Sequence, residues 1–373
     1  MPAATKRFGA IKSTACARNW PSCWRSLPVP PHEAVSTERP SADILRRGDW
    51  LIPYYPLIRH GDVQTILARY WPCSLDPQRY PTQSRFFATD ADTTVLAKVN
   101  ELDSGLAAEQ RPTVLALHGL TACDQAPYMV TSARAALSAG FDSIRLNMRN
   151  CGGTEHLCKT LYHSGLTLDL RRVVDELAPR PVYILGYSMG GNIALKLAGE
   201  WGENAPNHVQ AVCAVSPPVQ LAMCSREIGR LRNRVYEQRF MRRLRAALRQ
   251  KMALMPQEFP KRDLSSIKTI WQFDEEITAP AFGFTDAADY YRRCSSAAFI
   301  GDIRIPTLVL HAQDDPFIPF RAFDVDAFGQ NPWISLLAPP HGGHVAFLGR
   351  SGSWFWGQQQ AMRYFGAVSS AGG

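Results

Sequence analysis

A Gly-x-Ser-x-Gly motif at residues 186–190, centred on Ser188, is the pattern in this chain that most directly suggests chemistry. An apolar, strand-like run at 181–185 precedes it, and an alanine- and leucine-rich helical segment at 192–199 follows it. Strand, glycine-flanked serine and helix together predict the sharp turn called a nucleophile elbow. The glycines are required because Cβ atoms two residues either side of the serine would collide. We therefore expect the Ser188 hydroxyl to be exposed at the carboxyl end of a strand.

A serine hydroxyl is a poor nucleophile at neutral pH, so Ser188 needs a basic histidine, which in turn needs a carboxylate to orient it. When a serine sits on such an elbow, the partners follow in the order Asp or Glu, then His, each after a strand. Two later strand-like runs, 306–311 and 333–337, are followed by two aspartates and by two histidines respectively. Their order and positions predict a Ser-His-Asp triad.

The sequence offers two candidates for each partner. We choose Asp315 because an Asp-x-x-aliphatic-Pro run after such a strand usually carries the orienting carboxylate on its first residue, which leaves Asp314 as the alternative. His344 lies deeper in its loop, after two glycines, and is preferred over His341. The two histidines also fit a His-x-x-His metal motif, but no third ligand has suitable spacing, so we predict no metal and no cofactor.

The oxyanion that forms during acyl transfer needs preorganised N–H donors. We assign one to the backbone amide of Met189, directly after the nucleophile, and the other to the loop after the strand at 113–117, at Leu120. The His118 side chain in that loop is expected to pack rather than to transfer protons.

The elements that must position these residues alternate between strands and helices. Strands are expected at 113–117, 142–148, 181–185, 208–215, 306–311 and 333–337, and a β-hairpin at 86–100. Helices are expected near 62–69, 128–138, 167–177, 192–199, 321–328 and 354–365. This alternation predicts an α/β fold with a mostly parallel, doubly wound sheet.

The chain divides into four parts on this interpretation. Residues 1–48 are expected to be a disordered extension. The aromatic and proline-rich segment 49–80 is expected to be an arm that packs on the core. Residues 81–218 and 301–368 form the α/β core, and the segment 219–300 forms a helical lid inserted before the strand that carries the aspartate.

Basic residues are concentrated in the predicted lid. The chain has 41 Lys and Arg against 33 Asp and Glu, a formal net charge of +8. Many of the cations fall at 226–251. They fit a solvated helix face, or a surface for weak association with anionic membranes or phosphate-bearing substrates. Nucleic acid is not an expected partner, because no recognition fold accompanies the charge.

Composition limits the class of protein. The chain is 46% hydrophobic and 20% charged, as in globular proteins, and no apolar run is long enough to span a bilayer. No apolar segment follows the basic residues near the N-terminus, which argues against a secretory signal. Nine irregularly spaced cysteines favour neither a disulfide framework nor a zinc site. We therefore predict a cytoplasmic protein.

Several short motifs occur along the chain in a specific order. They are Val-Gln-Thr-Ile at 63–66, His-Gly-Leu-Thr at 118–121, Asn-Met-Arg-Asn-Cys-Gly-Gly at 147–153, Leu-Tyr-His-Ser-Gly at 161–165, Gly-Tyr-Ser-Met-Gly-Gly-Asn at 186–192, Asp-Asp-Pro-Phe at 314–317 and His-Gly-Gly-His at 341–344. Over roughly 53–365 the sequence resembles the YheT-like branch of the α/β-hydrolase superfamily, whose members are esterases and lipases. The resemblance implies an α/β-hydrolase fold and places the triad on Ser188, Asp315 and His344.

The resemblance implies a serine carboxylic-ester hydrolase that acts through an acyl-enzyme on short-chain esters or monoacylglycerol-like lipids. An alcohol O-acyltransferase with the same triad, or a non-catalytic binding protein of the same fold, are the alternatives. Three positions depart from the family pattern, where Asn150, Ala122 and Ala346 replace glycine. If Ala122 or Ala346 requires a positive φ, the shape of the pocket differs from that of the family.

Overall fold

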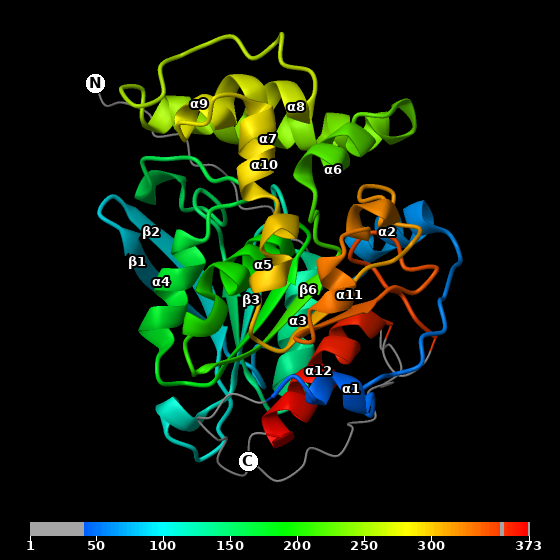
Figure 1. Cartoon of the computed structure of the whole chain (residues 1–373). Helices are drawn as coiled ribbons and strands as arrows, with labels where there is room; N and C mark the ends of the chain where they lie inside the picture. Colours follow the sequence, from blue (N-terminus) through cyan, green and yellow to red (C-terminus); the bar gives the residue numbers. More distant parts are fainter. Residues whose placement is uncertain (1–40, 351–353, 372–373) are drawn as a thin grey trace, which may run out of the picture.

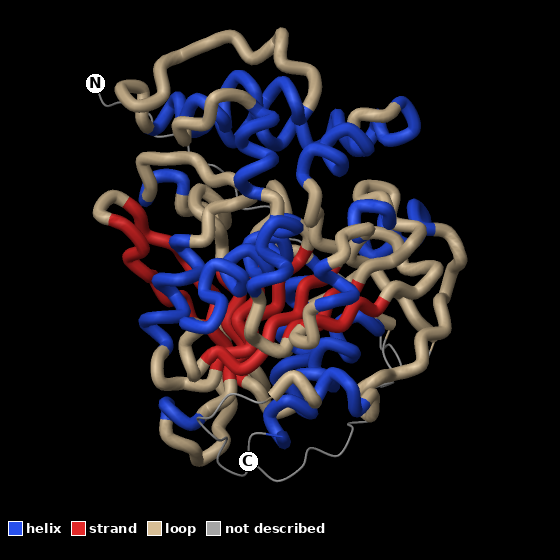
Figure 2. Tube along the Cα trace, in the orientation of Figure 1, coloured by secondary structure: helices blue, strands red, loops and turns tan. Residues whose placement is uncertain are grey.

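An eight-stranded sheet forms the centre of the molecule (Figure 2). The structure, a computed structural model, describes residues 41–350 and 354–371. The strand order is β1-β2-β4-β3-β5-β6-β7-β8; β2 pairs antiparallel with β1 and with β4, and the remaining pairs are parallel. The strands are β1 Gln83–Asp90, β2 Thr93–Asn100, β3 Thr113–Leu117, β4 Asp142–Leu146, β5 Val182–Tyr187, β6 Val209–Val215, β7 Thr307–Leu310 and β8 Ile334–Leu337. This is the mostly parallel α/β sheet predicted from the sequence.

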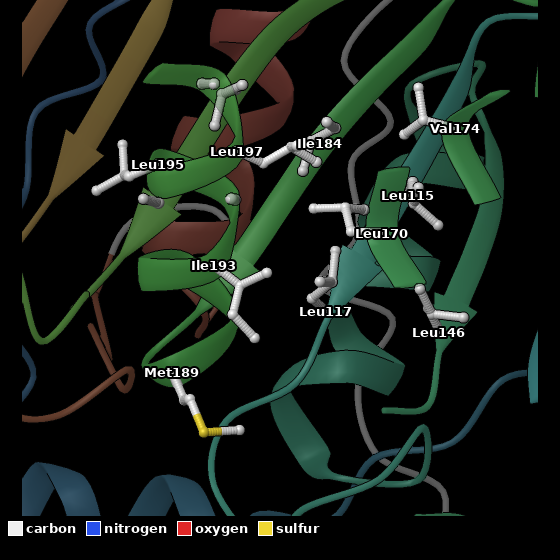
Figure 3. Packing of buried hydrophobic residues seen from close by; sticks show 14 of the residues in the cluster. Leu115, Leu117, Leu146, Leu170, Val174, Ile184, Met189, Ile193, Leu195 and Leu197 are labelled. Atoms are coloured by element: carbon white, nitrogen blue, oxygen red, sulfur yellow. The ribbon is translucent and has the colours of Figure 1, made fainter. Parts of the chain in front are cut away.

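Helices cover both faces of the sheet (Figure 1). In β3, Leu115 and Leu117 belong to one hydrophobic cluster and Val114 and Ala116 to the other, because successive side chains of a strand point to opposite faces. Helices α4 (Leu168–Leu177), α5 (Met189–Trp201) and α11 (Ala327–Gln330) contribute to the first cluster, and α1 (Ile44–Arg47), α3 (Pro127–Ser138) and α12 (Trp356–Ala371) to the second. Figure 3 shows Leu170 of α4 and Ile193 of α5 packed beside the central strands.

The segment 219–300, predicted as a lid, lies between β6 and β7 and is largely helical. It contains α6 (Leu221–Ile228), α7 (Arg234–Leu254), α8 (Ile270–Phe273), α9 (Ala279–Ala281) and α10 (Ala287–Cys294). We call it the helical insert. Helices α7 and α8 share a cluster that includes Met241 and Leu248, while α6, α9 and α10 contribute to another that includes Leu221 and Tyr290. Figure 1 shows the insert beyond one edge of the sheet.

The predicted N-terminal extension lies mostly outside the described residues. Of residues 41–48, which are described, Ile44 in α1 is buried and accepts a hydrogen bond at its carbonyl from the Trp50 indole. The arm at 49–80 contains α2 (Gly61–Tyr70) and packs on α12 through the rings of Tyr54 and Trp356, whose centroids are 4.5 Å apart. The last helix runs to Ala371, beyond the boundary predicted at residue 368.

The helix predicted at 321–328 is not continuous. A 3₁₀ turn (Phe320–Phe323) and the short α11 occupy this stretch, separated by Asp324, Val325 and Asp326. Aspartate and the β-branched valine are weak helix formers, which explains the break.

The turn between β5 and α5 is tighter than a side chain permits. A Cβ atom on Gly186 would lie 2.4 Å from the carbonyl oxygen of Gly190 and 2.6 Å from Cα of Gly191. On Gly190 it would lie 2.7 Å from the carbonyl oxygens of both Leu117 and His118. The glycines thus let the turn close on itself and approach the end of β3.

We expect the substitution Gly186→Ala to lower the free energy of unfolding by about 1–3 kcal/mol, because the added methyl group meets backbone atoms that cannot move aside. Urea denaturation measures this change. Gly301→Ala is the matched control, since a Cβ atom there meets no atom within 4 Å. Equal stability of the two variants would contradict the close packing described for the turn.

Candidate active site

Ser188, His344 and Asp315 are brought together at the carboxyl edge of the sheet. Nε2 of His344 lies 3.0 Å from Oγ of Ser188, and Nδ1 lies 2.8 Å from Oδ2 of Asp315. The three residues follow β5, β8 and β7, so the ends of three strands in the parallel part of the sheet, with β6 between β5 and β7, supply one hydrogen-bonded chain. Such a chain allows the imidazole to accept the serine proton while the carboxylate holds its other nitrogen.

The backbone of Ser188 is held in an unusual conformation. Its φ is 53° and its ψ is −121°, which side-chain-bearing residues rarely adopt. The Ser188 amide donates to the carbonyl of Val215 at the end of β6 (2.8 Å), and its carbonyl accepts from Gly191 and Asn192 in the first turn of α5. These bonds fix the elbow between a strand and a helix and leave the hydroxyl directed at His344.

Asp315 is held from both sides. Its Oδ1 accepts the backbone amides of Phe317 (2.8 Å) and Ile318 (3.1 Å), while Oδ2 faces His344. Burial raises the pKa of the Asp315 carboxyl, but the His344 imidazole and the donated hydrogen bonds outweigh it, so the pKa lies below its ordinary value. The carboxylate is therefore ionised and fixed in orientation beside the imidazole.

The other aspartate and histidine form a second pair beside the first. Asp314 Oδ2 lies 3.2 Å from Nδ1 of His341, and Oδ1 accepts the amide of Gly343 at 2.9 Å. This pair connects the loop after β7 to the loop after β8. Because the two imidazoles face different carboxylates, they do not share a metal-binding centre. Within residues 41–350 and 354–371, no group of three His, Cys, Asp or Glu side chains could hold a metal ion.

The loop after β3 lies against the elbow. Leu120 and Met189 both line the same cavity as Ser188 and His344. Among the described residues, neither the Leu120 nor the Met189 backbone amide donates to a protein acceptor. The assignment of these two amides as oxyanion donors stays a prediction, and the structure shows both residues beside the serine without a protein acceptor.

His118 is buried and supports that loop. Its Nδ1 bonds to the carbonyl of Gly119 (2.8 Å), and Nε2 accepts the amide of Met148 (3.1 Å), which fixes one neutral tautomer. Burial lowers the pKa of His118 from 6.5 to about 4. The buried, neutral His118 side chain thus packs under the loop, as expected from the sequence.

Helix α2 of the arm supports the loop that carries His344, a role not predicted from the sequence. Thr65 Oγ1 accepts the backbone amide of His344 at 2.9 Å and donates to the carbonyl of Gly61 at 2.7 Å. Gln64 Oε1 accepts the amide of Leu348 at 2.8 Å, four residues further along the loop. The only sequence signal for these contacts was the Val-Gln-Thr-Ile motif, which has no chemistry of its own.

A cavity of about 290 Å³ opens beside the triad. Its lining combines the serine end with side chains of the helical insert, mainly apolar ones: Phe240, Leu244, Leu248, Ile270 and Phe273. A smaller polar group at Ser225, Asp274 and Tyr291 also lines it, in which the Tyr291 hydroxyl donates to Asp274 (2.6 Å) and lies 3.1 Å from the Ser225 hydroxyl. Apolar walls with few polar groups are typical of sites for small organic ligands.

The three departures from the family pattern have different consequences. Asn150 adopts a φ of 58°, a conformation that asparagine tolerates better than most residues. Neither Ala122 nor Ala346 has a positive φ; the left-handed residues are their neighbours Thr121, Val345 and Phe347. The two alanines therefore impose no backbone strain on the cavity.

Comparison with known proteins gives consistent matches. A family model described as alpha/beta hydrolase fold matches residues 112–351. A protein of Escherichia coli K12 named "Putative esterase YheT" is 34% identical over 248 residues, covering 65% of this chain and 72% of that protein. A monoacylglycerol lipase of Saccharomyces cerevisiae is 30% identical (66% of this chain, 58% of the lipase), and a mouse protein named phospholipase ABHD3 is 29% identical (66% and 60%).

The burial of His118 leads to a pH dependence. Because its folded pKa of about 4 lies below the ordinary 6.5, the unfolded chain binds the proton more readily between these values. His118 therefore contributes stability above pH 6.5 that is lost as the pH falls towards 4, by up to about 3 kcal/mol. We expect a flatter fall in His118→Asn than in the wild type when the free energy of unfolding is measured by urea titration across this range. An identical pH dependence would show that other groups account for it.

The Thr65 hydroxyl leads to a second prediction, on the reactivity of Ser188. We expect Thr65→Val to slow labelling by a fluorophosphonate probe on the order of tenfold, because the His344 backbone loses its acceptor and the imidazole shifts from the serine. Thr65→Ser retains the hydroxyl and should label at nearly the wild-type rate. Thermal unfolding of both variants is the control for a general loss of stability. Equal labelling of Thr65→Val and the wild type would show that Thr65 does not position His344.

Proposed function

The chain belongs to the YheT-like branch of the alpha/beta hydrolase family and is a hydrolase of the carboxylesterase and lipase type, and we propose that it cleaves carboxylic esters through Ser188, His344 and Asp315. The observation that carries this proposal is the hydrogen-bonded chain from Asp315 through His344 to the Ser188 hydroxyl. The rest of the mechanism follows from the contacts of these three side chains.

Attack begins with Ser188. Its Oγ adds to the ester carbonyl carbon while its proton passes to Nε2 of His344, and the Asp315 carboxylate stabilises the imidazolium that results. His344 then gives this proton to the departing alcohol, and the acyl group remains on Ser188. Water attacks the acyl-enzyme by the same proton route in reverse, which releases the acid and restores the serine.

The negative oxygen of the tetrahedral intermediate needs two donors. The free amides of Leu120 and Met189 are the proposed donors, and Met189 is also the first residue of α5, where the helix dipole favours negative charge. Each such donor contributes a factor on the order of 10²–10³ in turnover. Neither depends on its side chain, so substitutions at these positions test packing rather than the donor itself.

The cavity suggests where the two parts of an ester bind. The apolar side chains of α7 and α8 suit an acyl chain, and the polar group of Ser225, Asp274 and Tyr291 suits a hydroxyl-bearing alcohol. Short-chain esters and monoacylglycerol-like lipids are therefore the proposed substrates. The yeast relative bears the name of a monoacylglycerol lipase, in agreement with this class.

The exposed basic residues of the helical insert favour an anionic partner. Arg234, Arg242 and Arg249 of α7 are exposed, and so are Arg230 and Arg232 just before it. Near an anionic lipid surface each such cation contributes about 1 kcal/mol of attraction. No helix in the described part of the chain has the length and apolarity needed to cross a membrane. We propose weak association with an anionic membrane surface through this insert.

Hydrolysis of p-nitrophenyl esters of increasing chain length tests the function. We expect Ser188→Ala to lose several orders of magnitude in turnover. Ser84→Ala is the matched control, because this serine is exposed on β1 and does not line the cavity. Comparable rates for Ser188→Ala and the wild type would refute the mechanism. No turnover by the wild type would favour the non-catalytic binding protein. Ester formation that replaces hydrolysis when an alcohol is added would favour the acyltransferase.

A further inference from the structure

Helix α2 is amphipathic, but its apolar side faces solvent. Val63, Ile66, Leu67 and Tyr70 recur at the spacing i, i+3, i+4 and i+7, which places them on one face of a helix. Their exposed fractions are 39%, 47%, 37% and 69%. In a surface helix of a globular protein such a stripe normally packs on the core, so its exposure needs an explanation.

The inward face of α2 is polar and is held by the loop that carries His344. The Gln64 side chain is fully buried between Ile58 and Leu348, and Thr65 binds the amide of His344. A Cβ atom on Gly61 would lie 1.9 Å from the carbonyl oxygen of Asp314, so the start of the helix also abuts the aspartate loop. These contacts prevent α2 from turning its apolar side inwards.

Further exposed apolar side chains occur where α7 begins, next to α2. The Tyr236 hydroxyl donates to Asp62 at 2.9 Å, and Arg239 donates to the Tyr70 hydroxyl at 3.3 Å, so α7 lies beside α2. Figure 1 shows α2 on the same side of the molecule as α6, which leads into α7. Val235 in the first turn of α7 and Leu231, three residues before that helix, are 76% and 81% exposed. We call Val63, Ile66, Leu67, Tyr70, Leu231 and Val235 the apolar rim.

The apolar rim lies beside the cavity. The ring of Tyr236, which bonds to α2, contacts the ring of Phe317 with centroids 4.7 Å apart. Phe317 in turn contacts the imidazole of His344 at 4.6 Å and lines the cavity. A surface bound to the rim would therefore lie next to the proposed site of hydrolysis.

The charges around the apolar rim are mainly positive. Exposed arginines flank it in both segments: Arg59, Arg69, Arg230, Arg232 and Arg234. The acids among them are fewer, namely Asp62, which accepts from Tyr236, and the buried Glu227, which pairs with Arg230 and Arg232, so positive charge remains in excess. A second copy of the chain would bring this positive surface against its equal, which is unfavourable. Anionic lipid headgroups above an apolar layer match both the arginines and the apolar side chains.

We propose that the apolar rim docks on an anionic lipid surface, with the exposed side of α2 inserted among the lipids and the arginines on the headgroups. The inference deepens the proposed function, since it identifies the surface from which an ester reaches Ser188. The same helix then contacts lipid on one side and orients His344 on the other.

Vesicle sedimentation tests the docking surface with the full chain. The vesicles are phosphatidylcholine alone and an equimolar mixture with phosphatidylglycerol, each at low and high salt. The test variant carries Ile66→Gln with Leu67→Gln, which retains helix-forming residues. The matched control carries Leu51→Gln with Leu254→Gln, two leucines outside the rim that are 48% and 49% exposed. Thermal unfolding establishes that both variants are folded.

We expect the wild type and the control to bind the anionic vesicles, more strongly at low salt, and the Ile66→Gln, Leu67→Gln variant to bind on the order of tenfold more weakly. Its turnover of a soluble short-chain ester should equal that of the wild type, while its turnover of an ester dispersed in vesicles should fall. Sedimentation of Ser188→Ala separates docking from hydrolysis, because this variant should bind vesicles as the wild type does although it has lost turnover. A wild type that binds vesicles but hydrolyses no ester would contradict the mechanism and leave the docking proposal intact.

Three results would overturn the docking proposal. The first is a wild type that does not sediment with anionic vesicles. The second is equal binding by the Ile66→Gln, Leu67→Gln variant and the wild type, since the arginines alone would then account for it. The third is a wild-type dimer in size-exclusion chromatography that this variant abolishes, because the apolar rim would then be covered by a second copy.

Discussion

The close approach of the β5–α5 turn to the end of β3 is the constraint on which the rest of the site depends. With no side chain at Gly190, the turn approaches the carbonyls of Leu117 and His118 so closely that a Cβ atom would overlap them. This brings the loop with Leu120 to the serine and the serine to the N-terminus of α5. The proposed oxyanion donors and the proposed nucleophile therefore depend on the same backbone packing.

The carboxyl ends of the strands concentrate backbone strain. Thr121, Asn150, Ser188 and Ser216 follow β3, β4, β5 and β6, and each adopts a positive φ although it carries a side chain. Such conformations cost of order 1–3 kcal/mol each and persist only where surrounding contacts enforce them. The Ser216 hydroxyl, for example, accepts the amide of Val345, which adjoins His344. The surrounding contacts thus hold loops that would relax differently in isolation.

Much of the fold could be predicted from local patterns. The strand at 113–117 was predicted with the bounds the structure gives, because a short buried apolar run has few alternatives. The break in the helix predicted at 321–328 was missed, although Asp324 and Asp326 are weak helix formers and stand where the helix is interrupted. The support of His344 by Thr65 was also missed. These residues are far apart in the sequence, and a threonine hydroxyl gives no pattern that indicates a distant amide.

The sequence by itself determined the order of elements, the nucleophile elbow and the candidate partners of Ser188, because each of these depends on local spacing and residue type. Only the tertiary structure shows which imidazole contacts Ser188, which carboxylate contacts that imidazole, and which way α2 faces. The apolar stripe of α2 would be assigned to the core from its period alone. The structure turns it outwards, because the buried hydrogen bonds of Gln64 and Thr65 hold the polar side of the helix against the His344 loop.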